Sequence, residues 1–297
     1  MSRKIHKWIF LQTLFQFLLP QRSLSRLAGW IACCELPWIK DRLIKNFIRY
    51  YQVDMSLAVK EDRCEYRHFN EFFTRALKLE NRPIATESTA IVSPIDGYVS
   101  QFGGIQEGQL IQAKGINYSL LALLGGYKEL ALQFQQGNFA TFYLSPKDYH
   151  RVHNACDGQL EEMIYVPGRL FSVNPKTTEH LPGLFTRNER VICLFETSVG
   201  PMAIILVGAM LVASISTVWE GMITPTTSRS IRRWCYTKNT IFLPKGEELG
   251  RFQLGSTVIL LFSSDCIKWS HELSIGKRVQ FGQYIGKYVS TSRNISP

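Results

Sequence analysis

Three separated stretches of the sequence supply an acid, a histidine and a serine, residue types that can act together on a carbonyl. They are Asp96 in SPIDG, His153 in YHRVH and Ser256 in LGST. An acid that orients a histidine, which then removes the proton of a serine hydroxyl, turns that hydroxyl into a nucleophile. Chain order among such residues varies freely between folds, so this order is compatible with a catalytic triad.

Each residue alone also has an ordinary structural explanation. Asp96 precedes a glycine, which is typical of a turn. His150 and His153 are three residues apart, but no third ligand with metal-site spacing accompanies them, so we expect no metal. Ser256 follows a glycine and precedes the apolar run 258–262, where a tight turn needs only a glycine and a polar residue.

The neighbours of Ser256 decide between kinds of serine chemistry. A hydrolase with a nucleophile elbow shows G-x-S-x-G followed by a helix, whereas here the serine follows Gly255 directly and precedes a predicted strand. The electrophile nearest to an activated Ser256 is therefore the Gly255 carbonyl, and glycine tolerates the strained backbone that such an attack requires. The sequence predicts self-cleavage between Gly255 and Ser256.

The elements that must position these residues are mainly strands. Residues 40–80 read as helices over 41–59 and 69–77, and 81–87 as an exposed connector containing a proline. From residue 90 onward, eight or more short β-type runs are separated by Gly, Pro or Asp-Gly. We predict an α+β protein: a mainly-β single catalytic domain over 51–297, with mixed or antiparallel sheets, barrel- or sandwich-like, preceded by a helical region over 1–50.

The N-terminal region 1–50 is strongly basic and rich in large apolar residues. It contains nine Lys and Arg against two acids. Because the whole chain has a net charge of +10, most of the excess positive charge lies in this region, and the charges of the remaining chain are nearly balanced. Residues 8–20 are apolar but too short to span a bilayer, and three tryptophans lie in the region. This predicts an amphipathic helical arm on an anionic membrane surface, and no nucleic acid partner. A signal peptide and an arm that merely packs on the core are the alternatives.

The seven cysteines are scattered, with no CxxC pair and no His/Cys spacing typical of zinc. We interpret them as reduced thiols of a cytoplasmic protein.

Around these motifs the chain resembles the bacterial, membrane-associated phosphatidylserine decarboxylase proenzymes. The similarity is carried by stretches that cover roughly residues 45–262; they include YYQVDM, FNEFFTRAL, SPIDGYVSQ, YLSPKDYHRVH, MIYVPGRLFSVN and GRFQLGSTVILLF. LGST alone is a weak signal, but in this context it is specific. The first 44 residues and the last thirty match only in character.

The resemblance implies a pyruvoyl-dependent carboxy-lyase made as a zymogen. Asp96, His153 and Ser256 would carry out the self-cleavage, giving a β chain 1–255 and an α chain 256–297 that remain associated. Ser256 would become a covalent pyruvoyl group, which forms a Schiff base with phosphatidylserine and yields phosphatidylethanolamine. His150 is a candidate proton donor, and Lys114 and Lys147 could meet a phosphate, although a solvated lysine is the ordinary case. We expect a peripheral protein on the cytoplasmic face of the inner membrane, with a homodimer left open.

Three other readings remain open. The repeated Asp-Gly turns at 96–97 and 157–158 resemble biotinyl- and lipoyl-type carriers, but no modifiable lysine in an MKM or DKA triplet occurs. A pyruvoyl decarboxylase of a soluble amino acid would not need the apolar arm. A serine hydrolase using the same triad lacks its nucleophile elbow.

Overall fold

The structure is a computed structural model that describes residues 21–113, 115–210, 214–224, 228–236, 241–253, 256–263 and 267–289. The first twenty residues of the predicted arm 1–50, Lys114 and Gly255 lie outside these residues. The helices are α2 (Gln21–Ala32), α3 (Pro37–Tyr51), η1 (Arg63–Glu65), α4 (Phe69–Phe73), η2 (Leu79–Asn81), α5 (Leu120–Leu123), α6 (Lys128–Phe134), α7 (Pro175–Thr178) and α8 (Leu184–Arg187).

The described strands all lie between residues 90 and 288. They are β1 (Ala90–Val92), β2 (Gly97–Gly104), β3 (Gln109–Ala113), β4 (Ile116–Ser119), β5 (Asn138–Leu144), β6 (Arg151–His153), β7 (Gly158–Val166), β8 (Arg190–Thr197), β9 (Gly200–Val207), β10 (Ile215–Thr217), β11 (Gly221–Met222), β12 (Arg232–Cys235), β13 (Phe242–Leu243), β14 (Glu248–Phe252), β15 (Ser256–Phe262), β16 (Ile267–Trp269), β17 (Arg278–Val279) and β18 (Tyr284–Tyr288).

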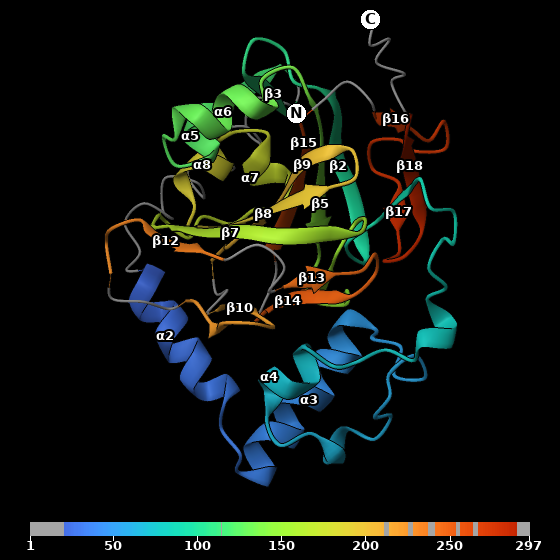
Figure 1. Ribbon diagram of the computed structural model, residues 1–297. Coiled ribbons are helices and arrows are strands. Elements are labelled where there is room, and N and C mark those ends of the chain that lie inside the picture. The colour runs from blue at the N-terminus through green and yellow to red at the C-terminus, as the bar shows by residue number, and fades with distance from the viewer. Residues whose placement is uncertain are drawn as a thin grey trace, which may run out of the picture.

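Among the described residues, a nine-stranded sheet holds the main core (Figure 1). Its order is β12-β7-β8-β9-β15-β5-β2-β17, and β13 also pairs with β7. Strand β15 lies inside this sheet, antiparallel to β5 on one side and to β9 on the other. All seven of its residues are buried, which explains why the sequence shows a continuous apolar run instead of an alternating one.

A smaller sheet, with the order β11-β10-β14-β6, carries the other part of the predicted site. His153 ends β6 opposite Glu248 of β14. The chain passes from β5 to β6 through 145–150 and from β14 to β15 through 253–255. Because β5 pairs with β15 and β6 pairs with β14, these two connections run between the same two sheets. The topology therefore brings the stretch with the histidines alongside the stretch with Ser256.

Helices α2, α3 and α4 lie together below the sheets in Figure 1 and have a small aromatic core of their own. Phe47 of α3 packs edge-on against Phe69, Phe72 and Phe73 of α4. Both predicted helices are shorter than expected. Helix α3 ends at Tyr51 because Gln52 takes a left-handed conformation with φ 52°.

Helix α4 ends at Phe73 rather than at residue 77. The Thr74 hydroxyl donates to the Asn70 carbonyl at 2.9 Å, and the chain then turns so that Arg75 is buried. The prediction of a mainly-β protein with a helical preface is confirmed, with open sheets instead of a closed barrel. No helix in the described part of the chain is long and apolar enough to cross a membrane.

Candidate active site

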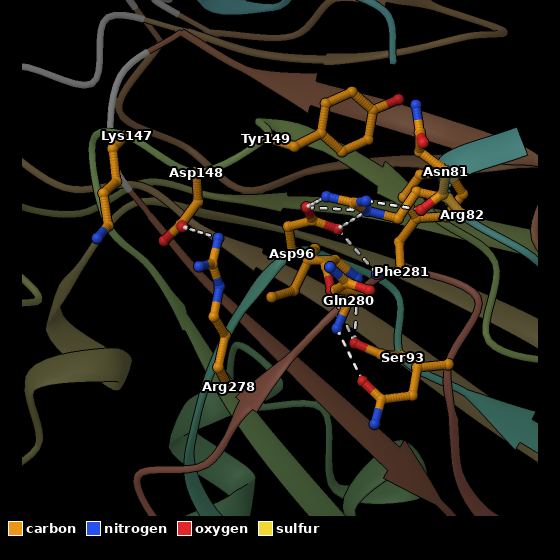
Figure 2. Close-up of polar contacts among 12 residues, drawn as sticks. Asn81, Arg82, Ser93, Asp96, Lys147, Asp148, Tyr149, Arg278, Gln280 and Phe281 are labelled. Atoms are coloured by element: carbon orange, nitrogen blue, oxygen red, sulfur yellow. Dashed lines mark hydrogen bonds and ion pairs between the residues drawn. The ribbon is translucent and has the colours of Figure 1, made fainter. Parts of the chain in front are cut away.

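Asp96 lies in the turn between β1 and β2, and its carboxylate is fully paired (Figure 2). Arg82 Nε donates to both carboxylate oxygens at 3.1 Å, and Arg82 Nη2 donates to Oδ2 at 2.5 Å. The Phe281 N–H donates to Oδ1 at 2.9 Å. Asp96 is 2% exposed and Arg82 is 5% exposed. The prediction of an exposed connector over 81–87 is wrong for Arg82, because a buried carboxylate requires a cationic partner.

Gly97 explains how the Asp96 turn packs so closely on the main sheet. A Cβ at this position would collide with the Tyr143 carbonyl oxygen of the neighbouring strand β5. The glycine of SPIDG is therefore required for close approach of two backbones, not only for a turn.

His153 is held at both ring nitrogens. Its Nδ1 lies 2.8 Å from the Gly246 carbonyl oxygen, and its Nε2 lies 3.1 Å from the Tyr149 hydroxyl. A carbonyl can only accept, so Nδ1 carries the proton and Nε2 presents a lone pair that accepts from Tyr149. The backbone N–H of His153 also donates to the Pro94 carbonyl at 2.8 Å. Since Pro94 is two residues before Asp96 in the chain, this bond ties the histidine backbone to the Asp96 turn.

The surroundings keep the His153 ring neutral. Burial lowers its pKa from the ordinary value, although the hydrogen bond to Gly246 and the charge of Asp96 act in the opposite direction. The Phe281 ring stacks on the imidazole with centroids 4.0 Å apart and planes 7° apart. Phe281 thus contacts His153 with its ring and Asp96 with its N–H. Among the described residues, no direct hydrogen bond joins Asp96 to His153.

Ser256 is the first residue of β15 and is completely buried. Its Oγ has no hydrogen-bond partner among the described residues, His153 included. The chain just before it is well held: the Phe252 N–H donates to the His150 carbonyl at 3.0 Å. The Gln253 side-chain oxygen accepts from Asn70 Nδ2 at 3.2 Å and from Ser214 Oγ at 3.0 Å.

His150 lies in the 145–150 connection and is completely buried, with its ring stacked 4.1 Å from that of Phe73. Its Nε2 lies 3.1 Å from the Ser145 carbonyl and 3.3 Å from the Pro146 carbonyl, so Nε2 carries the proton. Nδ1 is a buried acceptor without a partner in the described structure. Burial, and then the charge of Arg75, lower the His150 pKa to about 3, so the ring is neutral at pH 7.

The structure therefore brings the predicted residues to neighbouring elements without assembling a hydrogen-bonded triad. Asp96 is bonded to Arg82, His153 to Tyr149 and Gly246, and Ser256 to none of them. The sequence prediction missed the partners Arg82, Gly246, Tyr149 and Phe281. The sequence motif could have indicated Tyr149, because this residue directly precedes His150 in YHRVH. The other three are distant in sequence, and only the strand register places them here.

Chemically, the site offers a neutral histidine with an available lone pair and a serine hydroxyl free of competing bonds. Both lie out of water, where proton transfer and charge separation depend on the protein alone. In the described part of the chain, no three His, Cys, Asp or Glu side chains are grouped so that they could hold a metal.

The fold and site together define a class: a mainly-β enzyme whose candidate serine starts a buried strand. Comparison with known proteins is specific. A family model described as phosphatidylserine decarboxylase matches residues 69–287, and one described as PSD matches 11–52. The chain is 55% identical to the phosphatidylserine decarboxylase proenzyme of Azotobacter vinelandii over 92% of this chain and 96% of that protein.

The proenzymes of Stutzerimonas stutzeri and Yersinia pestis are each 52% identical, over 93% of this chain and 94% and 96% of their own lengths. The chain belongs to the phosphatidylserine decarboxylase family. It is a carboxy-lyase made as a zymogen.

Proposed function

We propose that this protein cuts itself between Gly255 and Ser256 and then decarboxylates phosphatidylserine to phosphatidylethanolamine. The β chain 1–255 and the α chain 256–297 stay together, and Ser256 becomes the pyruvoyl group. One observation carries the proposal: in a chain of this family, a completely buried serine at the start of a central strand has a hydroxyl that bonds to nothing described.

A pyruvoyl group fits position 256. Converting the serine would break no hydrogen bond of its side chain, because Oγ makes none among the described residues. The position is shielded from water, which protects a reactive ketone. The conversion leaves the carbonyl side of residue 256 within β15, so the new group stays anchored in the sheet.

In the cleavage step His153 acts as the base, since its neutral ring has a lone pair on Nε2. Tyr149 must release this nitrogen before the Ser256 hydroxyl can give up its proton to it. The alkoxide adds to the Gly255 carbonyl carbon, the peptide C–N bond breaks, and an ester with a free amine results. β-Elimination removes the Cα proton of residue 256 to a base, breaks the Cβ–O bond and releases the Gly255 carboxylate. The dehydroalanine left at position 256 takes up water and loses ammonia.

Asp96 supports this step through charge. Its carboxylate lies near enough to favour the imidazolium that forms on His153, and Phe281 holds the ring and the carboxylate in a fixed relation. Arg82 counterbalances that charge in the resting precursor.

The pyruvoyl ketone would bind the amine of the substrate and supply an electron sink for the electron pair that the breaking C–C bond releases as CO₂ leaves. His150 is our candidate for proton transfer to or from that substrate. At pH 7 it is neutral, with Nδ1 as an acceptor, so it must first gain a proton before it can donate one. A substrate carboxylate beside it would raise its pKa and favour that gain.

We further propose peripheral attachment to an anionic membrane, on the cytoplasmic face. In the described helices α2 and α3, Trp30 is 76% exposed and Trp38 is 72% exposed, and Leu27 of α2 and Leu36, which caps α3, are exposed as well. Large apolar side chains on a basic helical region are typical of proteins that lie in the interface. Replacing Trp30 and Trp38 by serine should weaken sedimentation with anionic vesicles while self-cleavage proceeds normally.

Intact mass under denaturing conditions tests the main proposal. We expect two chains that divide between Gly255 and Ser256, with the shorter one lacking a free amino terminus and reducible by borohydride. A single unmodified chain that still decarboxylates the lipid would contradict it. His153→Gln should slow the cleavage about 100-fold or more, because general base catalysis is worth roughly that much. Cleavage of this variant at the normal rate would remove His153 from the mechanism.

A further inference from the structure

A polar cavity of about 240 Å³ lies beside Asp96, between the end of α3, the 145–150 connection and β17 (Figure 2). Its lining is unusually rich in charge. The charged residues are Arg75, Arg82, Lys147 and Arg278, together with Asp54, Asp96 and Asp148. Four cations face three acids, so the lining carries an excess of one positive charge.

The acids are largely satisfied by their own neighbours. The Asp96 carboxylate accepts hydrogen bonds from the Arg82 guanidinium and the Phe281 N–H. The N–H and hydroxyl of Ser145 donate to Asp148 Oδ2 at 2.8 and 2.6 Å, while Oδ1 is 3.7 Å from Arg278 Nη2.

The remaining acid, Asp54, accepts from the N–H and hydroxyl of Ser56 at 3.0 and 2.7 Å. Asp148 Oδ1 is buried without a hydrogen bond and has the Arg278 guanidinium 3.7 Å away, whereas the other buried side-chain atoms of the lining without a partner in the described structure are Nε and Nη1 of Arg75.

Arg75 is the clearest case of an unmatched cation. It is only 5% exposed, its Nη2 donates to the Lys147 carbonyl at 3.3 Å, and its Nε and Nη1 have no partner in the described structure. Burial lowers its pKa from the ordinary value, which measures the cost of keeping the charge there. Leaving two donor nitrogens of a buried guanidinium without hydrogen bonds is costly unless an anion accepts from them.

Two further cations, Lys147 and Arg278, line the cavity and have side-chain donors without a hydrogen-bond acceptor among the described residues. Lys147 is exposed, and its Nζ makes no hydrogen bond to any described residue. The Arg278 side chain is 54% exposed, and among the described residues its one ion-pair contact is the 3.7 Å approach to Asp148. With Arg75, they supply a planar fork and two mobile charges, which is the donor set that binds phosphate.

A large apolar groove of about 630 Å³ adjoins this cavity. Tyr98, Tyr143 and Ile275 lie in its wall. Tyr98 of β2 is paired directly with Arg278 of β17, so the groove and the cavity share one pair of strands. A cationic cavity next to an apolar groove matches a molecule with an anionic group and a hydrocarbon chain.

We propose that the cavity binds the phosphate group of the phospholipid substrate through Arg75, Lys147 and Arg278, with one acyl chain in the adjoining groove. The identity of the lipid rests on the proposed function, whereas the phosphate chemistry rests on the cavity alone. The site would hold the phosphodiester of the substrate while the amine of the substrate's serine headgroup reacts at residue 256.

The test uses the uncut Ser256→Ala chain, so that binding is measured without chemistry. Calorimetric titration should show that glycerophosphoserine binds and that inorganic phosphate competes with it. Lys147→Gln and Arg278→Gln should each weaken this binding about tenfold, because each removes charge-assisted hydrogen bonds. Lys128→Gln, which removes an equally exposed lysine far from the cavity on α6, should change nothing.

A short-chain phosphatidylserine below its micelle concentration separates the lipid from the free headgroup. It should bind more tightly than glycerophosphoserine, and Ile275→Ser should remove most of that advantage while leaving headgroup affinity intact. Arg75→Lys keeps the charge but loses the fork, and should weaken phosphate binding in a chain whose circular dichroism is unchanged.

Absence of binding, or equal affinity in the Lys147 and Arg278 variants and the parent, would overturn the proposal. Equal affinity for lipid and headgroup would remove the groove from it. These outcomes are independent of self-cleavage: a wild-type chain that never cuts at Ser256 refutes the proposed function while the anion titration still stands.

Discussion

The side-chain polar atoms of Asp96 and His153 all have partners, whereas Ser256 Oγ and His150 Nδ1 have none in the described structure. Asp96 has Arg82 and Phe281, and both nitrogens of His153 are occupied. Ser256 Oγ and His150 Nδ1 are equally buried and have no partner in the described structure. His150 lies in the connection from β5 to β6, only three residues before His153, so the difference is local.

This difference separates the part of the site that is held from the part that reacts. Buried polar atoms are nearly always paired, and exceptions require an explanation. The paired region fixes a neutral histidine in the tautomer of a base. The unpaired region keeps a hydroxyl and an acceptor free of bonds that a reaction would first have to break. The precursor therefore spends stability where its chemistry takes place.

The largest effect is expected at the unpaired hydroxyl. Ser256→Ala should abolish the appearance of a 42-residue α chain, as the denaturing intact mass would show. Thr257→Val is the matched control, because Thr257 is the next residue, is buried in the same strand, and also has an unpaired hydroxyl. It should be cleaved normally. If both variants stayed uncut, the freedom of the hydroxyl would not single out Ser256.

A smaller effect is expected when the paired region is broken. Arg82→Met leaves the Asp96 charge buried without its cation, which should cost about 3–5 kcal/mol in the free energy of unfolding. Urea unfolding of the uncut Ser256→Ala chain measures this loss. The double change Arg82→Met with Asp96→Asn should recover a substantial part of it.

The surface pair of Lys78 and Glu61 is the control for that experiment. Lys78→Met should leave the urea midpoint nearly unchanged, because exposed ion pairs contribute little. An Arg82 variant as stable as the Lys78 variant would mean that Asp96 does not depend on its pair.

Measured over a single pH unit, the smallest effect is a change with pH at the unpaired histidine. The folded protein holds His150 neutral with a pKa of about 3, against 6.5 when unfolded, so the unfolded chain binds the proton first. The stability from this group is present above pH 6.5 and is lost as the pH falls toward 3, at up to ~1.4 kcal/mol per pH unit. His150→Gln should flatten that part of the curve, whereas a change at the exposed His271 should not.

Much of this comparison could be predicted from sequence, and the limits have physical causes. The apolar run over 258–262 predicted a buried strand, and β15 confirms it. The resemblance singled out Asp96, His153 and Ser256, and whether they act as a triad stays a prediction. Arg82 was misjudged because a charged residue beside Pro83 is usually solvated, and only the folded chain brings a buried carboxylate to it.

Gly246 and Phe281 could not have been found in the same way. Gly246 lies two residues before Glu248, which pairs with His153 across β14 and β6, and its φ of 81° is one that glycine adopts readily. Phe281 comes from a turn 128 positions away. Pairings over such distances depend on the whole topology, not on local pattern. The predicted end of the helix over 69–77 was wrong for a related reason, because the burial of Arg75 overrides the helical pattern that continues after Phe73.

The position of β15 between β5 and β9 has a further consequence once the proposed cut is made. The shorter fragment, 256–297, contains β15, which is an inner strand of the main sheet, and also β16, β17 and β18. It can leave only if the sheet opens, so the nick is held closed by hydrogen bonds instead of a peptide. The same nick is a one-way event for folding. The precursor finds its topology as a single molecule, but the two fragments, once separated, would have to find it by collision.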